Sequence, residues 1–165
     1  MSSTASRVSH IQYAALPWRE AEGTIEILLV TTRNTGRWIV PKGWPVDDHT
    51  PSESAAYEAL EEAGVLGDTA VEPLGSFHYS KRRKSGEIVS CKVFVFAMEV
   101  VRQRRRWAEK SARETCWCSL EDARARVTDP GLRRLIAKFA RHRAPGGAPR
   151  SQSAGRRIRG RAAPA

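Results

Sequence analysis

The chain has 165 residues, of which 41% are hydrophobic and 28% charged, values typical of one globular domain with a buried core. No apolar run approaches the roughly 18 residues that span a membrane, and the N-terminal segment lacks the apolar stretch of a secretory signal. Three cysteines, an odd number, argue against a disulfide framework. These features predict a cytoplasmic protein with no membrane partner.

The formal net charge is +10, which favours anionic partners such as phosphorylated metabolites or nucleic acid. Five arginines and no acidic residue lie in residues 144–165, so half of the excess falls in this segment. It is rich in Gly, Pro and Ala without apolar periodicity, which predicts a disordered basic tail that could contact nucleic acid. Residues 1–10 are polar and predict a flexible arm, which leaves 11–143 as the folded domain.

The first predicted strand is the apolar, β-branched run Ile25–Thr32, and a second short strand covers Trp38–Val40. A turn rich in Pro, Gly and Asp then leads into a helix predicted over Pro51–Ala63. Gly64 stands where a helix-ending glycine belongs. The helix has an apolar face at helical spacing, formed by Ala55, Ala56, Ala59, Leu60 and Ala63.

Strands are predicted again at Val71–Tyr79, Ile88–Val101 and Glu114–Cys118, with the basic segment Lys81–Gly86 as a hairpin tip. Two helices follow, one opened by a capping-box-like Ser119 and Asp122, the other by Asp129 and a proline. The second helix has an apolar stripe of Leu132, Leu135, Ile136 and Phe139. Strands and helices intermixed in this way predict an α/β sandwich around a mixed sheet.

Three carboxylates in the first predicted helix carry the functional prediction. Glu58, Glu61 and Glu62 stand at i, i+3 and i+4, so they share one helical face and repel one another. A divalent cation would remove that conflict, and Mg²⁺ prefers oxygen ligands together with substrate phosphates. The alternative is an ordinary solvated helix face.

The segment from Gly43 to Val65 resembles the Nudix box, G-x5-E-x7-R-E-U-x-E-E-x-G-U, in which U is a bulky apolar residue. The matching residues are Gly43, Glu58, Glu61, Glu62, Gly64 and Val65. The lead-in RWIVPKG (37–43), together with Trp107, Arg113 and the later WCSLEDA (117–123), resembles the diphosphoinositol polyphosphate phosphohydrolase branch. The resemblance covers roughly residues 11–142 and implies the Nudix fold, an α/β/α sandwich around a mixed β-sheet.

Two positions depart from the box. His49 stands where the family has glutamate, and Tyr57 stands where it has arginine. These two residues could form a substitute contact, or the site could be weaker, because residues that support metal ligands affect affinity and activity.

The resemblance implies that Glu58, Glu61 and Glu62 bind Mg²⁺, with Mn²⁺ as a substitute, and that Glu61 or Glu62 orients or deprotonates the attacking water. Gly43 is expected to allow a tight backbone turn near the substrate. The candidates for binding substrate phosphates are basic residues before the box and at the hairpin: Arg33, Arg37, Lys42, Lys81, Arg82, Arg83 and Lys84.

The predicted function is a Mg²⁺-dependent Nudix pyrophosphohydrolase that cleaves a phosphoanhydride bond in a polyphosphorylated small molecule. A diphosphoinositol polyphosphate or a dinucleoside polyphosphate is favoured over a nucleoside triphosphate. The alternatives are a catalytically silent Nudix-fold module that binds nucleotide or RNA, and an unrelated nucleic-acid-binding protein. Monomer and homodimer both stay open.

Other features have a structural and a functional interpretation. The basic segment Lys81–Lys84 is either a solvated turn or a phosphate clamp, and Arg102–Arg106 is either surface or a contact for nucleic acid. Trp44 could stack on a ligand or cover the helix. Cys116 and Cys118 are expected to be small core residues rather than zinc ligands.

Overall fold

The computed structural model describes residues 10–143, so all but the last residue of the predicted arm (1–10) and the whole predicted tail (144–165) lie outside the described residues. Within the described range, no helix is both long and apolar enough to cross a membrane. The elements are β1 (His10–Ala21), β2 (Thr24–Thr31), β3 (Trp38–Ile39), β4 (Lys42–Gly43), α1 (Pro51–Ala63), β5 (Val65–Thr69), β6 (Gly75–Arg82), β7 (Ile88–Gln103), β8 (Thr115–Ser119), α2 (Leu120–Arg126) and α3 (Pro130–Arg143).

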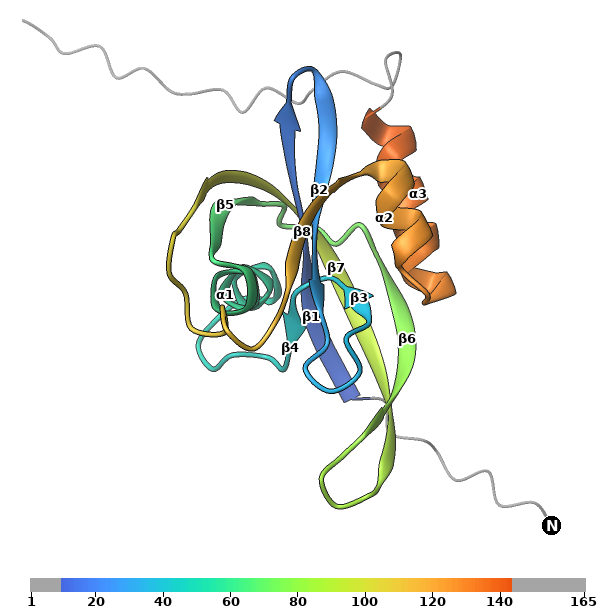
Figure 1. The fold of residues 1–165 in the computed structure, drawn as a ribbon. Coiled ribbons are helices and arrows are strands. Elements are labelled where there is room, and N and C mark those ends of the chain that lie inside the picture. Colours follow the sequence, from blue (N-terminus) through green and yellow to red (C-terminus); the bar gives the residue numbers. More distant parts are fainter. Residues whose placement is uncertain (1–9, 144–165) are drawn as a thin grey trace, which may run out of the picture.

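The strands form one mixed, eight-stranded sheet. Its main path runs β3-β2-β1-β7-β5, while β4 pairs with β1, β6 with β7 and β8 with β2 (Figure 1). The long strands β1 and β7 are parallel, and the other pairs are antiparallel. The centre of the sheet is therefore the β1–β7 pair, to which the site-bearing strands β4 and β6 attach.

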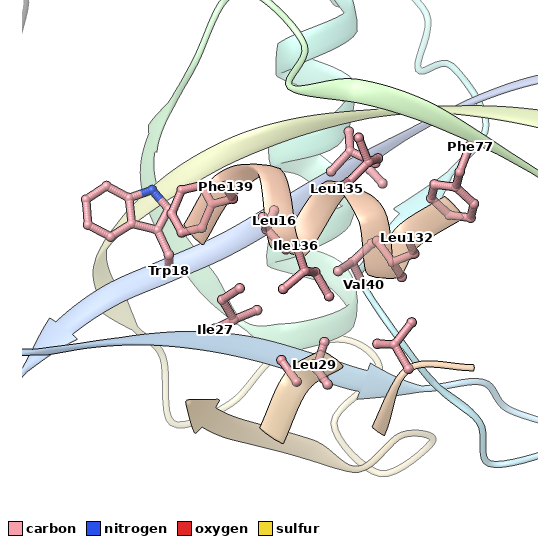
Figure 2. Packing of buried hydrophobic residues seen from close by; sticks show 14 of the residues in the cluster. Leu16, Trp18, Ile27, Leu29, Val40, Phe77, Leu132, Leu135, Ile136 and Phe139 are labelled. Atoms are coloured by element: carbon pink, nitrogen blue, oxygen red, sulfur yellow. The ribbon is translucent and has the colours of Figure 1, made fainter. Parts of the chain in front are cut away.

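Helices cover both faces of this sheet, with α1 on one side and α2 and α3 on the other (Figure 1). Strand β2 shows the alternation: Leu28 and Val30 pack with the α1 core, whereas Ile27 and Leu29 pack with the α3 core. The α3 core includes the predicted stripe Leu132, Leu135, Ile136 and Phe139 (Figure 2). The predicted α/β/α sandwich around a mixed sheet is confirmed.

The helix predicted at Pro51–Ala63 is confirmed as α1, and its ends explain its boundaries. Thr50 accepts a hydrogen bond from the Glu53 backbone N–H, while the Glu53 side chain accepts one from the Thr50 N–H, a complete capping box. Gly64 ends the helix with φ of 69°, a left-handed conformation that favours glycine. The Trp107 ring packs against Gly64, so no side chain fits there.

Strand β1 was not predicted, because a proline usually argues against a central strand. Pro17 is tolerated because the strand next to β1 changes at this point. Before Pro17, the Ala15 N–H donates to the Pro41 carbonyl at 3.1 Å; after it, β1 pairs with β2 from Trp18 onward. Pro17 therefore lies in the gap between two neighbours, where a backbone N–H is not needed. His10, predicted as the end of the arm, already begins β1.

The region after α1 also differs from prediction. Strand β5 was missed because its sequence contains Gly67 and Asp68, both poor strand formers. Gly67 lies at a register shift where its backbone approaches the Glu99 carbonyl too closely for any Cβ. The strand predicted at Val71–Tyr79 instead covers Gly75–Arg82, and Val71 is 80% exposed. The strands predicted near β2, β3, β7 and β8 are confirmed, with ends shifted by at most two residues.

Substitution of Gly64 tests the helix end. Gly23→Ala, at φ of 76° in open space, should cost only the left-handed penalty of about 1 kcal/mol. Gly64→Ala should cost about 2–4 kcal/mol, because its Cβ also displaces Trp107. Urea unfolding of both variants measures the difference, and equal losses would show that Trp107 does not constrain this position.

Candidate active site

A cavity of about 610 Å³ opens beside α1, β4 and β6. It is lined by six basic side chains and two carboxylates, a balance that favours a polyanionic ligand. The basic residues are Arg33, Arg37, Lys42, Lys81, Arg82 and Arg113, and the acidic ones are Glu58 and Glu62. Six of the predicted substrate-binding residues, including Gly43, therefore line one cavity.

The two carboxylates reach the cavity because α1 packs closely on β4. Glu62 Oε2 accepts a hydrogen bond from the Lys42 backbone N–H at 3.3 Å. The Glu58 carboxylate lies against Gly43, where a Cβ would overlap it. Gly43 therefore lies in the short strand β4 without the positive φ of a glycine turn, and its missing Cβ leaves room for the Glu58 carboxylate.

Burial dominates the protonation of both carboxylates. Glu62 is only 4% exposed, and burial raises its pKa to about 7, although Arg113 Nη2 lies 3.2 Å from Glu62 Oε1 and opposes the shift. Burial also raises the pKa of Glu58, and the negative charges of Glu109 and Glu61 add to the effect. A bound cation would lower the cost of ionising both groups.

The predicted three-carboxylate set is only partly assembled. Among residues 10–143, no group of three or more His, Cys, Asp or Glu side chains is arranged to hold a metal ion. Glu61 is half-buried and does not line the cavity, unlike Glu58 and Glu62. Since Mg²⁺ is commonly held by one or two carboxylates together with substrate phosphates, the Glu58–Glu62 pair fits it. Glu61 as a ligand or catalytic group stays a prediction.

The two departures from the box lie together and outside the cavity. The His49 and Tyr57 rings form an edge-to-face pair with centroids 6.3 Å apart, the substitute contact considered from the sequence. Neither residue lines the cavity. The guanidinium beside Glu62 comes instead from Arg113, just before β8, which also donates to the Thr31 carbonyl at 2.9 Å.

The loop between β7 and β8 supplies a further residue that the sequence analysis missed. Glu109 forms ion pairs with Arg33 and, at 3.5 Å, with Arg113. Arg33 is 57% exposed, so its pair is weakly stabilising and a ligand phosphate could compete for it. No periodicity in this loop marks Glu109, and only the fold brings it near the box.

The basic hairpin divides into two parts. Lys81 and Arg82 belong to β6 and line the cavity, whereas Arg83 and Lys84 lie at the tip and do not. The tip therefore covers residues 83–87 rather than Lys81–Gly86.

Trp44 also lines the cavity. Its side chain is 39% exposed, and the Lys81 ammonium lies 5.0 Å from its ring centroid.

A hydrogen-bonded chain at the cavity wall was also missed. The Lys42 ammonium donates to the Tyr79 hydroxyl at 3.0 Å, and that hydroxyl donates to Gln12 Oε1 at 2.6 Å. Gln12 is only 1% exposed and lies on β1, the strand that was not predicted. Its one signal in the sequence is a polar residue within the largely apolar segment 11–18, which becomes informative only once that segment is known to be a buried strand.

The NUDIX domain model matches residues 9–139, and the chain belongs to this family. Nudix hydrolase 12 of Arabidopsis thaliana is 32% identical over 120 residues, 71% of this chain and 59% of that protein. Diphosphoinositol polyphosphate phosphohydrolase 3-alpha of Mus musculus is 34% identical over 101 residues, 59% of this chain and 57% of that protein. The chain thus spans less than two thirds of the length of either relative.

Solved structures support the fold. A Caenorhabditis elegans Ap4A hydrolase superposes with a TM-score of 0.61 at 21% identity, covering 80% of this chain and 96% of that one. A diphosphoinositol polyphosphate phosphohydrolase is among the similar proteins, as the resemblance implied, but the plant relative matches a larger share of this chain. The comparisons establish the Nudix family rather than that branch.

The raised pKa of Glu62 predicts how stability varies with pH when divalent metal is removed. The folded chain keeps a proton on Glu62 up to about pH 7, whereas the unfolded chain loses it near the ordinary value of 4.5. The contribution of Glu62 to the free energy of unfolding is therefore fully present below pH 4.5. It falls by roughly 3 kcal/mol as the pH rises to 7 and stays reduced at higher pH.

Urea unfolding in EDTA, between about pH 5 and 8, measures this dependence. Glu62→Gln should flatten the slope, leaving the part due to Glu58, and the exposed Glu72→Gln should not change it. A slope that is the same in all three proteins would refute the assignment to Glu62.

Proposed function

We propose that the protein is a Mg²⁺-dependent hydrolase that cleaves a pyrophosphate bond in a small polyphosphorylated molecule. The observation that carries the proposal is the placement of Glu58 and Glu62 in one cavity with six basic side chains. The carboxylates suit a divalent cation, and the basic groups suit the several phosphates of a polyphosphate. The names of the relatives agree with this chemistry.

The mechanism assigns separate tasks to the two kinds of side chain. Glu58 and Glu62 would hold Mg²⁺, which when bound neutralises phosphate charge and activates water. The Lys42 N–H and Arg113 keep the Glu62 carboxylate in place. Arg37 and Lys81, together with the other lining basic groups, would bind the phosphates that are not attacked and fix the substrate for in-line displacement.

Both favoured substrate classes fit a strongly basic cavity, because each carries several phosphates. Trp44 is the lining residue that distinguishes between these two substrate classes. A half-exposed aromatic ring at a phosphate site offers a surface on which a nucleobase can stack. A phosphorylated inositol has no aromatic ring to place there. Trp44 therefore favours a dinucleoside polyphosphate, the class acted on by the Ap4A hydrolase with the same fold.

Carboxylate variants test the activity. Glu58→Gln and Glu62→Gln should each lower Mg²⁺-dependent phosphate release by at least about 100-fold, because each removes a metal-binding charge from the cavity. Glu72→Gln, an exposed glutamate outside the cavity, is the matched control. Glu61→Gln in the same assay tests whether that residue contributes.

An active Glu62→Gln enzyme would exclude this site. Wild-type protein that binds nucleotide or RNA without any metal-dependent turnover would favour the silent module instead.

Trp44→Ala tests the substrate class. It should raise KM for a diadenosine polyphosphate about 10-fold and leave KM for a diphosphoinositol polyphosphate within about 2-fold, since only the first stacks on the ring. Trp44→Phe should restore most of the loss. Equal effects on both substrates would assign Trp44 to the structure of the loop rather than to base binding.

A further inference from the structure

The Lys42 ammonium, like the charged ends of Arg37, Lys81 and Arg82, has no carboxylate within ion-pair distance in residues 10–143, whereas Arg33 and Arg113 each have one. What distinguishes Lys42 is a fixed neutral partner inside the cavity wall. Its one hydrogen bond goes to the neutral Tyr79 hydroxyl. The ammonium therefore keeps donor capacity for an anionic ligand in the cavity that it lines.

The Tyr79 hydroxyl has a fixed direction. It has one proton, which it donates to Gln12 Oε1 at 2.6 Å, so its oxygen is left to accept from Lys42. The Tyr79 ring adds a second contact, since the Lys42 ammonium lies 4.5 Å from its centroid. Each partner therefore restricts the lysine, which otherwise has four flexible carbon–carbon bonds.

The sheet explains why these residues meet. Strand β7 pairs with β1 on one side and β6 on the other, with Gln12 opposite Val93 and Tyr79 opposite Cys91. Lys42 joins them because β4 pairs with β1 at Ala14. All three residues line the cavity.

We propose that Gln12 and Tyr79 are positioning residues that hold the Lys42 ammonium as an anchor for a substrate phosphate. The inference rests on the proposed function for the identity of the ligand. Of three ammonium protons, one is used by Tyr79, which leaves two for phosphate oxygens. The Lys42 backbone N–H meanwhile holds Glu62, so a single residue ties the anionic ligand to the carboxylate site.

The test measures binding of inorganic tripolyphosphate by calorimetry in EDTA, so that it does not depend on metal or turnover. Tyr79→Phe and Gln12→Leu should each weaken binding about 10-fold, because the ammonium loses its fixed position. In the Lys42→Ala background, Tyr79→Phe should change binding by less than about 2-fold. Tyr13→Phe is the matched control, since the Tyr13 hydroxyl makes no hydrogen bond within the described chain.

A second measurement follows hydrolysis with Mg²⁺, where Tyr79→Phe should raise KM about 10-fold and change kcat less. The proposal is overturned if wild-type protein does not bind tripolyphosphate, if Tyr79→Phe binds normally, or if its effect persists undiminished without the Lys42 amine. Coupling between Tyr79 and Lys42 in binding, without any turnover of wild-type protein, would support the anchor while refuting the hydrolase. Urea unfolding of Tyr79→Phe separates loss of binding from loss of fold.

Discussion

The candidate site depends on the close contact between one turn of α1 and the two residues of β4. Glu62 accepts the Lys42 N–H, and Glu58 occupies the space that a side chain at position 43 would take. Small residues on the helix, Ala55 and Ala59, let α1 approach the sheet closely enough for this contact. The same contact buries Glu62 and leaves Glu58 half-buried, so the helix carries an electrostatic cost that Arg113 offsets only in part.

The central β1–β7 pair converts this local contact into a cavity. Strand β1 holds β4 and β2, while β7 holds β6, so groups from distant parts of the chain face one space. Lys42 comes from the first side, and Tyr79 and Lys81 come from the second. Six basic side chains and two carboxylates therefore line one cavity, although they come from separate parts of the chain.

Features set by local sequence could be predicted, whereas features set by strand pairing could not. Helix α1 has its capping residues, its alanine face and its final glycine within one segment, so both its ends and Glu58 were found. Strand β1 contains Pro17, which is tolerated only because the neighbouring strand changes beside it, and no sequence pattern reveals that change. Gln12 was missed for the same reason. Lys81 and Arg82 lie in the cavity wall because β6 extends to Arg82, two residues into the predicted hairpin tip. The composition of a segment does not fix the residue at which a strand ends.

His49 and Tyr57, the two residues that differ from the box pattern, affect the packing of the loop before α1 rather than the charges that line the cavity. The His49 ring, just before α1, packs edge-on against the ring of Tyr57 in the middle of the helix, and neither residue lines the cavity, although Tyr57 directly precedes Glu58. The positive charge beside Glu62 is supplied by Arg113, from a loop that Trp107 anchors to α1 by donating to the Glu62 carbonyl at 3.2 Å. A chain that lacks the box arginine therefore keeps a guanidinium at its more deeply buried carboxylate. The loop between β7 and β8 is consequently part of the site, although the box pattern contains none of it.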